Sequence, residues 1–266
     1  VCSSDLAWAL AREPIAGATG AARIASVALD PLPSAVDLME SLRSLVHSLS
    51  AQGVRLVVLP DLAGTDAQAV SQRELLPLIE GLSGETNTLL AVLLAERAAS
   101  TFKTCYLVGS GQVLATHRQT HLTAREIAAG YSPGDTPPPV VPTEIGNIAL
   151  LAGSEGLAPE VARGLKLRGA EFIAWSAGDL GVPLRTVART RANEERAYVA
   201  AAGGTGLDGG GFVIDPTGAV LADTLPGRTM AMSADVHRML TRWNDMAPGT
   251  NPVRDRRPET FGILFD

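Results

Sequence analysis

Residues 145–177 read IGNIALLAGSEGLAPEVARGLKLRGAEFIAWSA, and this stretch decides the fold class. An apolar run of strand length ends in the small residues around Gly153, and Pro159 then stands early in a segment whose apolar residues have helical spacing. The short apolar run EFIAWSA follows as a second strand. Strand, helix and strand in this order predict an α/β domain in which helices cover the sheets.

The same alternation of periods extends in both directions along the chain. A helix over 36–53 has Gly53 as its C-cap, and a helix over 72–86 is expected to be interrupted at Pro77. Ser110-Gly111 predicts a hairpin turn, and a second hairpin is expected around Pro216-Thr217-Gly218. The long helix at 185–196 runs into a strand. The other predicted strands are 23–29, 54–60, 89–96, 104–109, 112–118 and 211–223 with its turn.

Composition limits the class of protein and its partners. The 266 residues are 46% hydrophobic and only 4% aromatic, which suits one domain with one large core. The formal net charge is −6 and there is no run of Lys or Arg, so we expect neither nucleic acid nor an anionic membrane as a partner. No apolar stretch reaches the roughly 18 residues of a membrane span. A small molecule or a protein is the expected partner, and a cytoplasmic location is predicted.

The N-terminus and the cysteines carry little functional information. We interpret 1–6 (VCSSDL) as a translated sequencing adapter and 7–22 as a linker or remnant of a lost upstream segment, so the domain is predicted to span 23–266. A disordered natural start is the alternative. Setting Cys2 aside leaves Cys105 alone, which is neither a disulfide framework nor a metal site.

Five segments in order resemble the nitrilase, or carbon-nitrogen hydrolase, superfamily over residues from about 23 to 261. They are RLVVLPDLAG (55–64), GQVLATHRQTHLTAREIAAGYSPGD (111–135), the stretch 145–177, RTRANEERAYVAAAGG with GGFVIDPTGAVLAD, and DRRPETF. The resemblance implies a four-layer α-β-β-α sandwich that needs no cofactor or metal. It also implies a homodimer or higher assembly that pairs through PEVARGLKLRG and the C-terminal region.

The family's catalytic positions are changed in this chain. Members cleave amides and nitriles with a Glu, a Lys and a Cys, and the matching positions here hold Asp61, Gln119 and Gly153. A thiolate attacks, a carboxylate moves its proton and an ammonium stabilises the oxyanion. Glycine offers no nucleophile, and losing a nucleophile costs about 10⁶ in turnover. The resemblance therefore predicts a domain without the family's chemistry.

Three further residues are assigned to the pocket. The resemblance places Glu126 there as a second carboxylate, and Ser154 and Glu155 at the pocket floor. Without a lysine at 119, Asp61 and Glu126 are hypothesised to face each other with no intervening cation, which would raise one pKa and favour a cationic ligand. The alternative is that both carboxylates are solvated or paired with arginines such as Arg118.

Other motifs are interpreted as structural. AGSEG (152–156) resembles a nucleophile elbow with Ser154, but the only histidine downstream, His237, lies in a segment (SADVHRML) that looks like an ordinary domain-end helix. GTGLDG (204–209) precedes a strand instead of the helix that a dinucleotide site needs. His117 and His121 lack a third metal ligand nearby.

The predicted function is therefore a carbon-nitrogen hydrolase domain that is catalytically inactive and acts as a ligand-binding or scaffolding module. A small molecule in the former active-site pocket and a second copy of the chain are its predicted partners. The alternative is an active hydrolase of C-N bonds in amides or nitriles with a non-standard site. Sequence errors at all three positions are a third explanation.

Overall fold

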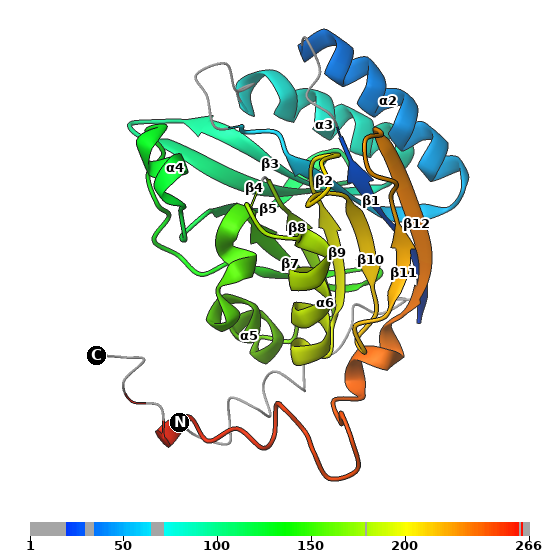
Figure 1. Ribbon diagram of the computed structural model, residues 1–266. Coiled ribbons are helices and arrows are strands. Elements are labelled where there is room, and N and C mark those ends of the chain that lie inside the picture. Colours follow the sequence, from blue (N-terminus) through cyan, green and yellow to red (C-terminus); the bar gives the residue numbers. More distant parts are fainter. Residues whose placement is uncertain (1–19, 30–34, 65–71, 179, 261, 263–266) are drawn as a thin grey trace.

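Two six-stranded sheets form the centre of the protein (Figure 1). The computed structural model describes residues 20–29, 35–64, 72–178, 180–260 and 262. The strands are β1 (Ala21–Ala28), β2 (Val54–Asp61), β3 (Leu89–Arg97), β4 (Thr101–Gly109), β5 (Gln112–Arg118), β6 (Val140–Thr143), β7 (Gly146–Ala152), β8 (Phe172–Ser176), β9 (Tyr198–Ala202), β10 (Gly211–Ile214), β11 (Val220–Asp223) and β12 (Met230–His237). The α-helices are α2 (Ala35–Ala51), α3 (Gln72–Thr86), α4 (Ala124–Ala128), α5 (Pro159–Leu167) and α6 (Leu184–Glu195), and the 3-10 helices are η1 (Gly153–Leu157), η2 (Arg238–Arg242) and η3 (Pro258–Thr260).

The strand orders of the two sheets are β12-β1-β2-β3-β4-β5 and β11-β10-β9-β8-β7-β6. Parallel pairs lie at the middle of each sheet, where β2 joins β1 to β3 and β8 joins β7 to β9. The outer pairs are antiparallel. The two sheets therefore repeat the same arrangement of strands.

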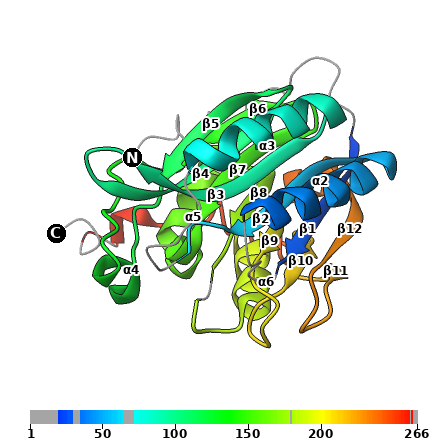
Figure 2. The ribbon, with the colours of Figure 1, turned by 90° about the horizontal axis from the view of Figure 1, so that it is seen from above.

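Helices cover the outer face of each sheet, which completes four layers (Figures 1 and 2). α2 and α3 lie on one side, where Leu42 and Ile79 pack in one core cluster with Val57 of β2. α5 and α6 lie on the other side, where Leu165 packs in a cluster with Ile173 of β8. A third cluster fills the space between the sheets. The predicted α-β-β-α sandwich is confirmed.

The apolar run of β2 shows why these segments form buried strands. Leu56 and Val58 point into the cluster between the sheets, whereas Val57 and Leu59 point into the cluster under α2 and α3. Successive side chains of a strand alternate between its faces, so a strand with both faces covered is apolar throughout.

Local details confirm one predicted turn and correct two predicted helices. The segment expected as a domain-end helix instead forms the end of β12 and the 3-10 helix η2. Ser110 (φ 51°) and Gly111 (φ 77°) form the predicted tight turn between β4 and β5. α3 is not interrupted at Pro77, because Pro77 and Arg73 are both exposed and water can bond the Arg73 carbonyl that loses its helical donor.

The N-terminal assignments are only partly within the described residues. The first strand begins at Ala21, two residues before the predicted start of the domain. The adapter at 1–6 and the linker up to residue 19 lie outside the described residues. Among the described helices, none combines the length and the apolar character that crossing a membrane requires.

Candidate functional site

Five polar side chains from five parts of the chain meet between the sheets, and we call them the polar centre. Asp61 ends β2, Lys103 lies on β4, Gln119 follows β5, Glu126 lies on α4 and Ser154 on η1. Their side chains are almost closed to solvent: Asp61 is 5%, Lys103 2% and Glu126 7% exposed, and Gln119 and Ser154 are 0% and 7% exposed as residues. The site that the sequence assigned is therefore brought together, with one addition.

Lys103 is that addition, and the sequence analysis missed it. Its Nζ donates to Asp61 Oδ2 at 2.5 Å and to Glu126 Oε1 at 2.8 Å, and it lies 5.6 Å from the centroid of the Tyr131 ring. The second oxygen of Asp61 accepts from the Ala63 backbone N–H at 2.8 Å. The predicted carboxylate pair without a cation is therefore wrong, because the ammonium lies between the two carboxylates.

Strand periodicity contained the signal for Lys103. Cys105 and Leu107 of β4 belong to the cluster between the sheets, and Lys103 has the same parity on the strand. A lysine on a buried strand face needs a counter-charge. Its partners are 42 and 23 residues away in the sequence, so they were visible only in the fold.

Gln119 fills the middle of the polar centre. Its Nε2 donates to the backbone oxygen of His121 at 2.8 Å and to Ser154 Oγ at 2.9 Å, and it lies 3.2 Å from Glu126 Oε2. Its backbone N–H donates to the carbonyl oxygen of Lys103 at 2.8 Å. The amide side chain is thus held against Ser154 and Glu126.

Gly153 lies directly beside the Gln119 side chain. Its φ is +47°, in the left-handed region, and a Cβ placed on it would lie 2.8 Å from Gln119 Cδ and 2.9 Å from Gln119 Nε2. Carbon atoms do not approach so closely. The space that a side chain at 153 would need is therefore taken by Gln119.

Glu126 serves both the polar centre and its own helix. Its Oε2 accepts from the Thr123 backbone N–H at 2.7 Å, while Thr123 Oγ1 accepts from the Glu126 N–H at 3.2 Å, which makes a capping box at the start of α4. The Thr-x-x-Glu spacing at 123–126 was a readable signal for this role. The capping box fixes the carboxylate toward Lys103.

Glu155 lies next to the polar centre but binds different partners. Its carboxylate accepts from the Thr120 backbone N–H at 2.7 Å and the Ala152 N–H at 3.1 Å, and it lies 2.8 Å from His117 Nε2. Both His117 and Glu155 are buried. Glu155 therefore ties the end of β5 to the end of β7, and the structural interpretation of His117 agrees with this contact.

The pKa directions follow from burial and the ion pairs. Burial raises the pKa of Asp61, and Lys103 opposes that shift. Burial works against ionisation of Glu126, but hydrogen bonds from Lys103 and Thr123 outweigh it and hold its pKa below the ordinary value. Burial would lower the pKa of Lys103, but the charges of Asp61 and Glu126 outweigh it, so its pKa is raised and the ammonium is kept.

The alternatives for these carboxylates and for Ser154 can now be compared with the structure. Arg118 pairs with Glu96 at 2.6 Å, so it is not the partner of Asp61 or Glu126. Ser154 Oγ donates to the His121 backbone oxygen at 2.6 Å, whereas the His237 ring accepts from Met239 N at 3.4 Å at the start of η2. The nucleophile-elbow interpretation gains no support from these contacts.

The remaining motifs are also placed. Residues 204–209 form the loop between β9 and β10, so the glycines precede a strand as expected. Within the described ranges, no group of three or more His, Cys, Asp or Glu side chains is arranged to hold a metal ion.

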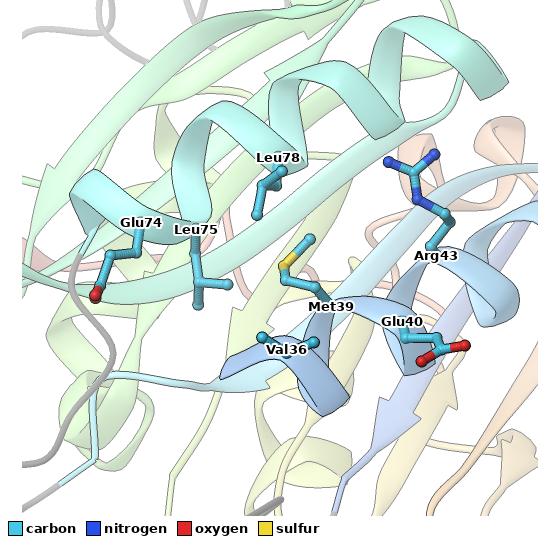
Figure 3. Close-up of a pocket in the computed structure, with 7 residues that line it drawn as sticks. All are labelled: Val36, Met39, Glu40, Arg43, Glu74, Leu75 and Leu78. Carbon is cyan, nitrogen blue, oxygen red and sulfur yellow. The ribbon is translucent and has the colours of Figure 1, made fainter. Parts of the chain in front are cut away.

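An apolar groove lies away from the polar centre, on the outer face of the sheet that contains β2. Figure 3 shows Leu75 and Leu78 of α3 pointing toward Met39 of α2. The groove has a volume of about 390 Å³, and its remaining lining residues are Val36, Glu40, Arg43 and Glu74. It has no contact with the polar centre, because the sheet separates them.

Comparison with known proteins identifies the family. The carbon-nitrogen hydrolase family matches residues 23–244, so the chain belongs to this family. An amidase from Nesterenkonia sp. has a TM-score of 0.77 and 23% identity, covering 92% of this chain and 97% of the amidase. A carbon-nitrogen hydrolase from Helicobacter pylori G27 has a TM-score of 0.79 and 18% identity, covering 93% and 99%. A comparison with curated proteins found no match. At these identities the solved structures show a shared fold.

Proposed function

We propose that this chain is a catalytically inactive carbon-nitrogen hydrolase domain that acts as a scaffold through its surfaces. The observation that carries the proposal is the contact between Gly153 and Gln119. Position 153 has no side chain, and the Gln119 amide lies within 2.9 Å of the place where a Cβ would be. A nucleophilic atom is therefore absent at position 153, and the Gln119 amide would have to move to admit one.

The closed polar centre supports scaffolding over ligand binding. Lys103 neutralises part of the charge of Asp61 and Glu126, and each of these three side chains is at most 7% exposed. A cationic ligand would have to displace an ammonium that already has two charged partners. The ligand-binding role is the second candidate, and the tight packing of Gln119 against Ser154 argues against it.

An active hydrolase with a non-standard site is the rival from another class. A mutant of the Nesterenkonia amidase, 23% identical to this chain, shows covalent addition of the acetamide moiety of fluoroacetamide at its active-site cysteine. In this chain Ser154 would have to take the place of a cysteine. Its hydroxyl is hydrogen-bonded to a backbone carbonyl, with no base within reach other than Glu126 at 3.4 Å in the described part of the chain.

Ammonia release across a panel of amides and nitriles tests the proposal. The natural chain is compared with the Asp61→Glu, Gln119→Lys, Gly153→Cys reversion, made with Lys103→Gln so that the carboxylates are free for the restored lysine. We expect no release from the natural chain and release from the reversion, because a restored thiolate regains a step worth about 10⁶ in turnover.

The matched control carries Gly153→Ala in place of Gly153→Cys in the same background and should be silent. Turnover by the natural chain that disappears in Ser154→Ala would overturn the proposal and make Ser154 the nucleophile.

A further inference from the structure

The charges of the polar centre are arranged around Lys103. Its ammonium binds one oxygen of Asp61 and one of Glu126, and the three side chains are 2%, 5% and 7% exposed for Lys103, Asp61 and Glu126. Among the described residues, these are the ion pairs that the two carboxylates make. Two buried carboxylates with one cation form a unit that depends on that cation.

Position 119 is the neighbour of Lys103 in space. The Gln119 backbone N–H donates to the Lys103 carbonyl at 2.8 Å, and the Gln119 Nε2 lies 3.4 Å from the same Glu126 oxygen that binds Lys103. An ammonium on residue 119 and an ammonium on residue 103 would therefore serve the same carboxylate.

We propose that Lys103 is a positioning residue that supplies the cation required by Asp61 and Glu126, in place of a cation at position 119, and so keeps the polar centre closed. This inference goes beyond the proposed function. It concerns which residue carries the positive charge, and it is tested by thermal stability. The proposed function is tested separately, by ammonia release, so the two can fail independently.

The physical argument rests on the asymmetry of buried ion pairs. Removing one member leaves an uncompensated buried charge and is strongly destabilising, whereas replacing all members by neutral groups of similar shape is often tolerated. A lysine that mattered only through its packing would be replaced well by methionine, whatever the charges around it. The charge requirement and the packing requirement are therefore separable.

The first test is a charge swap followed by thermal unfolding of the full chain. Lys103→Met is expected to lower the melting temperature by roughly 10 °C. Gln119→Lys alone should also lower it, because a second cation then faces Lys103. The Lys103→Met, Gln119→Lys double variant should recover at least half of the loss caused by Lys103→Met. A loss equal to the sum of the two single losses would overturn the inference.

The second test leaves Gln119 unchanged, so it does not depend on whether a lysine fits at position 119. The Asp61→Asn, Glu126→Gln pair is combined with Lys103→Met, so that the centre is neutral. We expect this triple variant to melt above Lys103→Met, because no unpaired carboxylate is left. The control is the fall in melting temperature that Asp61→Asn, Glu126→Gln causes in the natural chain. If the same pair lowered the melting temperature of Lys103→Met by the same amount, the inference would be contradicted. This test stands even if the charge-swap variant fails to fold.

The third test asks whether an added amine can replace the Lys103 side chain in the cavity that Lys103→Ala leaves. Propylammonium chloride should raise the melting temperature of Lys103→Ala more than that of the natural chain, whereas propanol at the same concentration should not. Equal effects of the two additives on Lys103→Ala would show that the site lacks volume and not charge, and would overturn the inference.

Discussion

At the scale of single residues, Gly153 and the side chain of Gln119 limit each other's space in the polar centre. Gly153 has a φ of +47°, a conformation that is strained for residues with a side chain, and Gln119 occupies the adjoining space. The absence of a side chain at 153 and the position of the Gln119 amide are therefore linked. A side chain at 153 requires the Gln119 amide to move.

We expect Gly153→Ala to lower the free energy of unfolding by about 2 to 4 kcal/mol, because backbone strain and overpacking add. In a Gln119→Ala background the same change should cost at least about 1 kcal/mol less, which is the overpacking component. Urea unfolding of the four chains measures both quantities.

Gly164 offers the matched control for that experiment. It lies in α5, and a Cβ on it would meet no atom within 4 Å. Gly164→Ala should be neutral or stabilising, by up to about 1 kcal/mol. If Gly153→Ala cost the same with and without Gln119, the contact would not be the source of the strain.

Sequence reasoning reached some of these residues and missed others for a physical reason. Asp61, Gln119 and Gly153 were found because the segments that contain them resemble the family, and Asp61 and Gly153 each stand at the end of an apolar strand. Lys103 was missed: strand parity marked it as facing inward, but its partner Asp61 lies 42 residues away in the sequence and was visible only in the fold. Contacts between distant segments are a property of the fold and leave little trace in one sequence.

At the scale of elements, β5 and η1 show the same difference between features that the local sequence predicts and contacts that only the fold reveals. The hairpin that ends at β5 was predicted from Ser110-Gly111, because only a few residues accept positive φ. The bond that joins the end of β5 to η1, from Thr120 to Glu155, was not predicted. Backbone conformation is encoded locally, whereas the pairing of buried polar groups is decided by which elements meet.

The packing of α5 against α6 contains a buried carboxylate with pH-dependent consequences. Glu195 of α6 is 1% exposed and lies 3.0 Å from Arg163 Nε of α5. Burial raises the pKa of Glu195 to about 7 despite Arg163. The folded chain therefore keeps a proton on Glu195 at a pH at which the unfolded chain has released it.

The sign of the pH effect follows from this difference in bound protons. Between pH 4.5, the ordinary pKa of the carboxyl, and about 7, the folded state binds more protons, so the free energy of unfolding falls as pH rises through this window and is level above it. Glu195→Gln has no such group. From about pH 5 to about pH 8 the natural chain should lose up to about 3 kcal/mol more than Glu195→Gln in urea unfolding.

Glu160 of α5 provides the control, since it is exposed. Glu160→Gln should keep the pH profile of the natural chain. Parallel profiles for Glu195→Gln and the natural chain would mean that Glu195 is ionised throughout and that Arg163 compensates its burial.

At the scale of the whole molecule, the C-terminal segment is attached to α5 through backbone carbonyls. Lys166 Nζ donates to the Thr241 oxygen at 3.0 Å, and Arg163 Nη1 donates to the Pro252 oxygen at 3.0 Å. This segment carries exposed apolar side chains, among them Trp243 at 70% and Met239 at 52%. Figure 1 shows it at one end of the sandwich, in orange and red.

A homodimer that uses α5 and the C-terminal segment stays a prediction, and the exposed Trp243 gives it a test. We expect Trp243→Ser to weaken self-association by at least about 20-fold, because buried tryptophans contribute about 2 kcal/mol or more at interfaces. Size-exclusion chromatography with light scattering over a range of concentrations measures the change.

Leu207 serves as the control because it is 91% exposed and lies in the loop between β9 and β10. Leu207→Ser should leave the association unchanged. A natural chain that is monomeric at every concentration, or a dimer that is insensitive to Trp243→Ser, would contradict the predicted interface.

The backbone bond between Gln119 and Lys103 has a consequence for how related chains are sorted. The family resemblance implies a lysine at the position of Gln119, and a neutral residue there would be counted as a lost charge. In this molecule a positive charge lies on the adjacent strand, on the residue whose carbonyl oxygen accepts from the Gln119 N–H. We therefore expect that a related chain with a neutral residue at this position has to be compared at the position of Lys103 as well.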